Sequence, residues 1–173
     1  MPDRWIALAG YMGAGKTTVG RRLASRLDLR FVDADKAIEE AAGIPIPTIF
    51  STKGELWFRR TEEAVIRDLV AEEPGVLALG GGAVESAKTR DVLRRKAHVV
   101  WLRASVDAAW RRVEGSDRPL AKDKDRFARR AASREPNYRE AADLEVDADR
   151  SPEEVVGGIA AWVEGLAPAE AGR

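Results

Sequence analysis

The chain has 173 residues, of which 45% are hydrophobic and 34% charged, and its 29 basic side chains balance 29 acidic ones. This length and composition predict a single globular domain, and the zero net charge argues against nucleic acid or an anionic membrane surface as a partner. The absence of cysteine and the single histidine exclude disulfides, thiolate metal sites and zinc sites built from several histidines.

Two features bear on localisation. The longest uncharged stretch, residues 41–52, contains two prolines and is too short to cross a membrane. The first residues lack the long apolar segment of a signal peptide. We therefore expect a cytoplasmic protein without a membrane partner, and a monomer is the default expectation.

Short apolar runs alternate with helical stretches along the chain. The expected strands are residues 5–9, 30–33, 76–79, 98–102 and 144–146. Every gap between them holds at least one helix, the first over residues 17–27 with apolar positions at helical spacing. The last helix is signalled by Ser151 as cap and Glu154 three residues later. This alternation predicts an α/β fold, a five-stranded parallel sheet sandwiched by helices, with ligands beyond the carboxyl ends of the strands.

Two connections are longer than a sheet requires. Residues 34–63 lie between the second and third strands and run into a helix over about residues 55–70, so we expect an inserted substrate-binding segment there. Residues 113–125 are mostly polar and charged, which is typical of a mobile lid. Residues 166–173 are expected to form a disordered tail.

Residues 10–17 match the phosphate-loop pattern G-x-x-x-x-G-K-[ST], after a strand and at the start of a helix. Its glycines let backbone N–H groups converge on an anion, while Lys16 can reach the outer phosphates and Thr17 can offer a hydroxyl to Mg²⁺. A nucleoside triphosphate is the predicted ligand. The chain has no glutamine, and its one asparagine, Asn137, is followed by Tyr138, so the GTPase signatures are missing. A bound hydroxyl is therefore a better acceptor than water.

Asp33 and Asp35 stand two apart at the end of the second expected strand, where they project to the same side. We expect this strand to neighbour the phosphate-loop strand, so that one carboxylate can serve Mg²⁺ and the other a substrate hydroxyl as general base. From spacing alone, Asp35 could equally be the cap of a helix over residues 36–42.

A triple-glycine turn, Gly80, Gly81 and Gly82, directly follows the third strand, and no acid occurs before Glu85. These glycines would let a ligand approach backbone N–H groups. Arg59 has Glu62 three residues later, a spacing that can hold a guanidinium in one orientation.

Together these motifs resemble the shikimate kinase family over about residues 5–163. The shared elements are Gly-x-Met-Gly-x-Gly-Lys in the phosphate loop, Phe31-Val-Asp33-Ala-Asp35, Ile46-x-x-Ile-Phe50, Gly54-Glu55-x-x-Phe58-Arg59, Leu79-Gly-Gly-Gly82, Arg118-Pro119-Leu120 and Arg134-x-Pro136-x-Tyr138. The resemblance implies the P-loop NTPase fold of the nucleoside monophosphate kinases. It also implies transfer of the ATP γ-phosphoryl group to the 3-hydroxyl of shikimate, on the route to chorismate and the aromatic amino acids.

Carried over by position, the resemblance assigns roles to individual residues. Lys16, Asp35 and Arg118 would be catalytic, with Asp35 as base and Arg118 reaching the phosphates from the lid, and Thr17 and Asp33 would hold Mg²⁺. The ATP-binding set is Gly13, Ala14, Gly15, Lys16, Thr17, Thr18, Arg111, Arg118 and Pro152, with Arg111 and Pro152 flanking the adenine. The shikimate-binding set is Asp35, Phe50, Phe58, Arg59, Gly80, Gly81, Gly82 and Arg134, with Arg59 and Arg134 as a clamp on the carboxylate.

The sequence departs from the family pattern at two places. Ala121 stands where the family usually has a second leucine after Arg-Pro-Leu, and Trp57 is bulkier than is common beside the substrate helix. Two other functions stay open from the sequence: another small-metabolite kinase such as a gluconate kinase, or a non-catalytic nucleotide-binding module.

Overall fold

The computed structural model describes residues 2–166. Its centre is a parallel sheet in the order β2-β3-β1-β4-β5. The strands are β1 (Trp5–Ala9), β2 (Phe31–Asp33), β3 (Val76–Ala78), β4 (Ala97–Arg103) and β5 (Leu144–Asp147). The five predicted strands and their parallel arrangement are confirmed.

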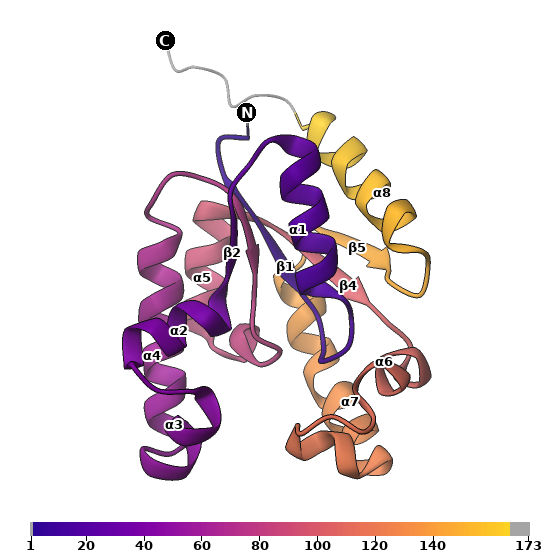
Figure 1. Cartoon of the computed structure of the whole chain (residues 1–173). Helices are drawn as coiled ribbons and strands as arrows, with labels where there is room; N and C mark the ends of the chain where they lie inside the picture. Colours follow the sequence, from indigo (N-terminus) through magenta and orange to yellow (C-terminus); the bar gives the residue numbers. More distant parts are fainter. Residues whose placement is uncertain (1, 167–173) are drawn as a thin grey trace.

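Helices cover both faces of the sheet (Figure 1). They are α1 (Lys16–Leu27), α2 (Ala34–Ala42), α3 (Ile46–Thr52), α4 (Glu55–Leu69), α5 (Ala87–Lys96), α6 (Val106–Val113), α7 (Lys124–Ala141) and α8 (Pro152–Glu164), with 3-10 turns η1 (Ala83–Glu85) and η2 (Pro119–Lys122). Side chains alternate along β1: Ile6 and Leu8 pack with α1 and α8, while Trp5 and Ala7 face the core shared by α4, α5 and α7.

The strand order corrects one expectation, because β3 lies between β1 and β2. The second strand is therefore not a neighbour of the phosphate-loop strand. All three residues of β3 are buried, which suits the interior of a sheet, whereas those of β2 are only partly buried, which suits its edge. The chain passes through α2, α3 and α4 before it returns as β3.

The helix after β2 corrects a second expectation. It begins at Ala34, and its cap is Asp33, whose carboxylate accepts hydrogen bonds from the N–H groups of Asp35 and Lys36. Asp35 is therefore not the cap. The prediction that it extends the strand beside Asp33 is also wrong, because the chain turns into the helix one residue earlier, and Asp35 lies in the first helical turn.

Helices α2, α3 and α4 enclose a small core of their own, formed by Ile38, Ile49 and Phe58. Helix α3 is not evident from the sequence, because Pro45 and Pro47 obscure a helical pattern. The structure places Pro45 at the cap and Pro47 in the first turn, where proline is tolerated. The predicted capping box of α8 is confirmed. Across residues 2–166, no helix has the length and apolar character needed to cross a membrane.

Candidate active site

The carboxyl ends of β1, β2 and β3 carry the central part of the predicted site. The phosphate loop follows β1, Asp33 ends β2, and the glycine turn follows β3, while α7 contributes Arg134 from the far side of that turn. Loops at this edge of a parallel sheet converge because all strands end there. In Figure 1 the α2–α4 segment and the α6–α7 segment lie on opposite sides of this edge.

The phosphate loop adopts a backbone that favours glycine at three positions, the first of which is Gly10 with a φ angle of 154°. Gly13 and Gly15 have φ angles of 83° and 93°. A Cβ on Gly13 would also lie 2.5 Å from the carbonyl oxygen of Ala109 in α6. Helix α1 begins directly after the loop, at Lys16, so that its unpaired N–H groups and the positive end of its dipole can face an anion. The loop therefore fits a phosphate group bound by backbone atoms.

Lys16 supplies the positive charge of this loop. Its Nζ donates hydrogen bonds to the carbonyl oxygens of Gly10 and Tyr11, at 2.6 and 3.1 Å. Burial lowers its pKa to about 8, although the Asp35 carboxylate opposes the shift, and the positive charge of Arg118 adds to the lowering. A bound phosphate would stabilise the ammonium form, so Lys16 is suited to respond to nucleotide.

Thr17 and Asp33 form a pair beside the loop, since the Thr17 hydroxyl donates a hydrogen bond of 3.3 Å to Asp33 Oδ2. The other Asp33 oxygen is fixed by its role as helix cap. The structure shows no cluster of three or more histidine, aspartate or glutamate side chains around a metal position in the part of the chain it describes. Mg²⁺ usually keeps waters and takes phosphate oxygens besides one or two protein ligands, so a hydroxyl and a carboxylate here fit it.

Asp35 lies between the phosphate loop and the glycine turn. A Cβ on Gly80 would be 2.9 Å from Asp35 Oδ1, and equally 2.9 Å from Glu62 Oε2. The pKa of Asp35 is raised, first by loss of hydration and then by the nearby Asp33 carboxylate, while Lys16 opposes the shift. A carboxylate with a raised pKa at this position is suited to accept a proton from a substrate hydroxyl.

Arg59, on α4, is held by the acid three residues later. Its Nη1 lies 2.8 Å from Oε1 of Glu62, and Glu62 is 2% exposed. Burial raises the pKa of Glu62, while the attraction of Arg59 lowers it. The Arg59 guanidinium packs against Gly82, where a Cβ would come within 2.6 Å of Nη2. The predicted pair is confirmed, and a side chain at position 82 would push the Arg59 guanidinium out of its present position.

Arg134 is 7% exposed, and its Nε lies 3.4 Å from Glu85 Oε1. Its Cζ is 5.6 Å from the centroid of the Tyr11 ring in the phosphate loop, and a Cβ on Gly81 would be 3.2 Å from its Nη1. Tyr138, one turn later on α7, donates a hydrogen bond to the carbonyl oxygen of Gly81, and burial raises its pKa so that it stays neutral. Each glycine of the turn thus faces a different functional side chain.

Two aromatic rings adjoin this end of the site. Phe58 is buried next to Arg59, whose Cζ lies 5.1 Å from its ring centroid. Phe50 is 40% exposed and packs on Phe58 with ring centroids 4.7 Å apart. The two rings therefore place an apolar surface beside the arginine.

The structure brings Arg112, and not its neighbour Arg111, to the phosphate loop. Arg112 donates hydrogen bonds to the carbonyl oxygens of Gly13 and Ala148, at 2.8 and 3.2 Å. Arg111 instead donates to Asp107 in its own helix and lines a hollow of about 440 Å³ with Trp110 and Lys124. The sequence reading missed Arg112, although its place beside the buried stripe Ala109 and Val113 could have indicated it.

Two further predicted residues lie in segments beyond the phosphate loop and the glycine turn. Arg118 precedes η2 in the segment between α6 and α7, and its charge acts on the pKa of both Lys16 and Asp35. Pro152 is the first residue of α8, after β5.

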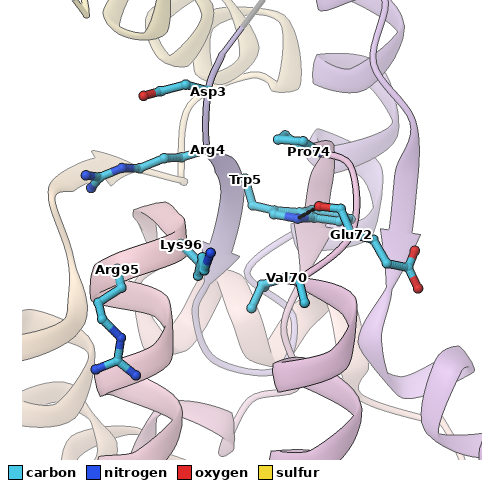
Figure 2. Close-up of a pocket in the computed structure, with 9 residues that line it drawn as sticks. Asp3, Arg4, Trp5, Val70, Glu72, Pro74, Arg95 and Lys96 are labelled. Atoms are coloured by element: carbon cyan, nitrogen blue, oxygen red, sulfur yellow. Dashed lines mark hydrogen bonds between the residues drawn. The ribbon is translucent and has the colours of Figure 1, made fainter. Parts of the chain in front are cut away.

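A second hollow, of about 250 Å³, lies at the amino end of β1, away from the phosphate loop. Trp5 lines it and donates a hydrogen bond to the carbonyl oxygen of Glu72. Figure 2 shows Arg4, Arg95 and Lys96 pointing in different directions around it, so these charges do not converge on one ligand.

These features define the class of P-loop proteins that act on small molecules. They are the parallel sheet in this order, the glycine loop at a helix N-terminus, and the carboxylate and two arginines around a further glycine turn. A family model described as shikimate kinase matches residues 12–164. The chain belongs to the shikimate kinase family.

Individual relatives agree with this assignment. A shikimate kinase of Nitrobacter winogradskyi is 52% identical over 82% of this chain and 68% of its own length. A solved shikimate kinase of Acinetobacter baumannii in complex with shikimate has a TM-score of 0.88 and 35% identity, and covers 93% of both chains. A gluconokinase of Sinorhizobium meliloti, at 18% identity and a TM-score of 0.59, shares the fold alone.

Proposed function

We propose that the protein carries out the reaction of its family, the transfer of the γ-phosphoryl group of ATP to the 3-hydroxyl of shikimate. The observation that carries the proposal is the glycine turn, where Gly80 faces Asp35, Gly81 faces Arg134 and Gly82 faces Arg59. This turn joins a carboxylate for hydroxyl groups to a pair of cations for a carboxylate. A small polyol acid has those two chemistries at opposite ends.

At the nucleotide end, the phosphate loop and the N-terminus of α1 hold the phosphates of ATP, and Lys16 and Arg118 stabilise the charge that develops during transfer. Thr17 and Asp33 hold Mg²⁺, which when bound neutralises phosphate charge. Arg112, which already contacts the phosphate loop, is better placed than Arg111 to border the nucleotide.

At the acceptor end, Asp35 binds the reacting hydroxyl and takes its proton as the new O–P bond forms. The bond between the γ-phosphorus and the β–γ bridging oxygen of ATP breaks in the same step, and ADP leaves. Arg59 and Arg134 bind the carboxylate with planar guanidinium groups, and this fixes the position of the ring. The backbone N–H groups of the glycine turn and the rings of Phe50 and Phe58 complete the pocket.

Residues 34–63 act as the substrate-binding segment of the single domain, and residues 113–125 act as its lid. The lid must close over the site, because water would otherwise compete with the acceptor for the phosphoryl group. Its far end contains η2, where Ala121 is buried and Leu120 packs against the core. The smaller Ala121 is therefore an anchoring residue of the lid despite its departure from the family pattern.

A coupled assay with ATP, Mg²⁺ and either shikimate or gluconate tests the proposal. Turnover with shikimate and little with gluconate is expected. Preference for gluconate would support the alternative sugar-acid kinase, and ATP binding without turnover of either acid would support a non-catalytic module.

A further inference from the structure

Glu85 places a carboxylate between the two arginines of the proposed clamp. Its Oε1 lies 3.4 Å from Nε of Arg134, and its Oε2 lies 4.0 Å from Nη2 of Arg59 and 3.9 Å from Nη2 of Arg130. The family motif that contains the glycine turn ends at Gly82, three residues before Glu85. Glu85 is therefore an additional charged group at the acid end of the site.

The backbone of Glu85 is fixed on both sides. Its N–H donates to the carbonyl oxygen of Gly82 at 3.1 Å, and its own carbonyl oxygen accepts from Nη1 of Arg90 at 3.0 Å. The side chain is 31% exposed, so it is partly shielded from water. A carboxylate on a tied backbone is suited to orient its partners.

Arg134 depends on this carboxylate more than Arg59 does. Glu62 and Glu55 lie 2.8 and 3.8 Å from Arg59. Among the residues that the structure describes, Glu85 is the one carboxylate within 4.0 Å of Arg134, which is 7% exposed. A guanidinium buried to this degree is unfavourable without a counter-charge, and two neighbouring guanidinium groups also repel each other.

We infer that Glu85 is a positioning residue, which keeps Arg134 buried and beside Arg59 before the substrate binds. It engages Nε of Arg134 and leaves the terminal nitrogens, of which Nη1 lies beside Gly81, for the substrate carboxylate. The inference rests on the proposed function, because it assigns the carboxylate of shikimate as the ligand of these nitrogens. Without Glu85, Arg134 turns toward water and the clamp is no longer formed in advance.

Steady-state kinetics of Glu85→Ala and Glu85→Gln test this role. For Glu85→Ala we expect KM for shikimate to rise about tenfold, from the loss of a hydrogen bond to a charged group, with kcat within about twofold and KM for ATP unchanged. Glu85→Gln keeps an oxygen acceptor for Nε and should recover part of the loss. The matched control is Glu135→Ala, which removes ion pairs with Arg139 on α7 and with Arg103 at the end of β4 and should change neither constant.

A shikimate analogue without the carboxylate separates positioning from general damage. Wild type and Glu85→Ala should bind this analogue equally weakly, and thermal unfolding should show both folded at the assay temperature. Three results would overturn the inference. In the first, Glu85→Ala weakens binding of the analogue as much as it weakens binding of shikimate. In the others, Glu85→Ala leaves KM for shikimate unchanged or lowers it, and a lowered KM would mean that Glu85 competes with the substrate carboxylate. If wild type fails to turn over shikimate in the same assay, the proposed function falls and this inference with it.

Discussion

The two ends of the site hold their ligands by different means. The phosphate end is one continuous segment, residues 10–17, in which backbone geometry and a helix N-terminus do most of the work. The acid end is assembled from side chains of α4, η1 and α7 that are far apart in the sequence, namely Arg59, Glu85 and Arg134. In the free protein the lysine of the phosphate end donates hydrogen bonds to carbonyl oxygens, whereas the arginines of the acid end form ion pairs with glutamates.

This difference separates stabilisation of the transition state from binding of the acceptor. Groups at the phosphate end act on charge that develops during transfer, so their loss should reduce kcat. Groups at the acid end bind a carboxylate that does not change in the reaction, so their loss should mainly raise KM for the acceptor. Four experiments can sharpen or break this division.

The largest effect is expected for Lys16→Ala. Turnover should fall by about 10³-fold or more, since Lys16 stabilises the transferring phosphoryl group. The fold should survive for two reasons. Among the residues described, the Lys16 ammonium donates hydrogen bonds only to loop carbonyl oxygens, and its burial disfavours the charged form. Single-turnover rates with circular dichroism would check this, with Lys36→Ala on the exposed part of α2 as control. Near-normal turnover would remove Lys16 from the mechanism.

Asp35→Asn should lower kcat by about 10²–10⁴-fold, because the amide cannot accept the hydroxyl proton. Shikimate affinity should weaken as well, since Asp35 binds the hydroxyl groups. Kinetics at several Mg²⁺ concentrations are the measurement. A fall in Mg²⁺ affinity with unchanged shikimate affinity would instead mean that Asp33 and Asp35 have exchanged roles.

Arg134→Leu and Arg59→Leu should each weaken shikimate binding by about 1.5–3 kcal/mol, the value of a hydrogen bond to a charged group, with little change in ATP affinity. Isothermal titration with each ligand would measure both. Equal losses for ATP and shikimate would contradict the division between the two ends. The matched control is Arg139→Leu, because Arg139 is exposed and lies on α7 with Arg134.

The smallest effect concerns pH. The pKa of Lys16 is lowered to about 8, so raising the pH through this value removes the ammonium charge in the free protein. The kcat/KM for ATP should therefore fall above about pH 8, by about tenfold per pH unit. In Lys16→Arg the guanidinium stays charged, and whatever activity is left should lack this decline. A flat profile in wild type would show that the phosphate end does not depend on this charge.

Much of the protein could be predicted from short segments of sequence. The phosphate loop depends on glycines, a lysine and a threonine at fixed spacing, and the strands depend on local apolar runs, so both are visible without tertiary information. Arg59 and Glu62 share one helix, and their ion pair was predicted from their spacing for the same reason. The family resemblance added the remaining site residues by position.

Other features were decided only by the tertiary structure. The place of β3 between β1 and β2 depends on which strands can be buried on both faces, a property of the whole sheet. The exact start of α2 decided that Asp33 caps it, and the rotation of α6 decided that Arg112 meets the phosphate loop. The contact of Glu85 with Arg134 joins residues 49 apart in the sequence, and only the packing of α7 on the glycine turn brings them together. Local sequence determines which groups are available, whereas long-range packing determines which of them meet.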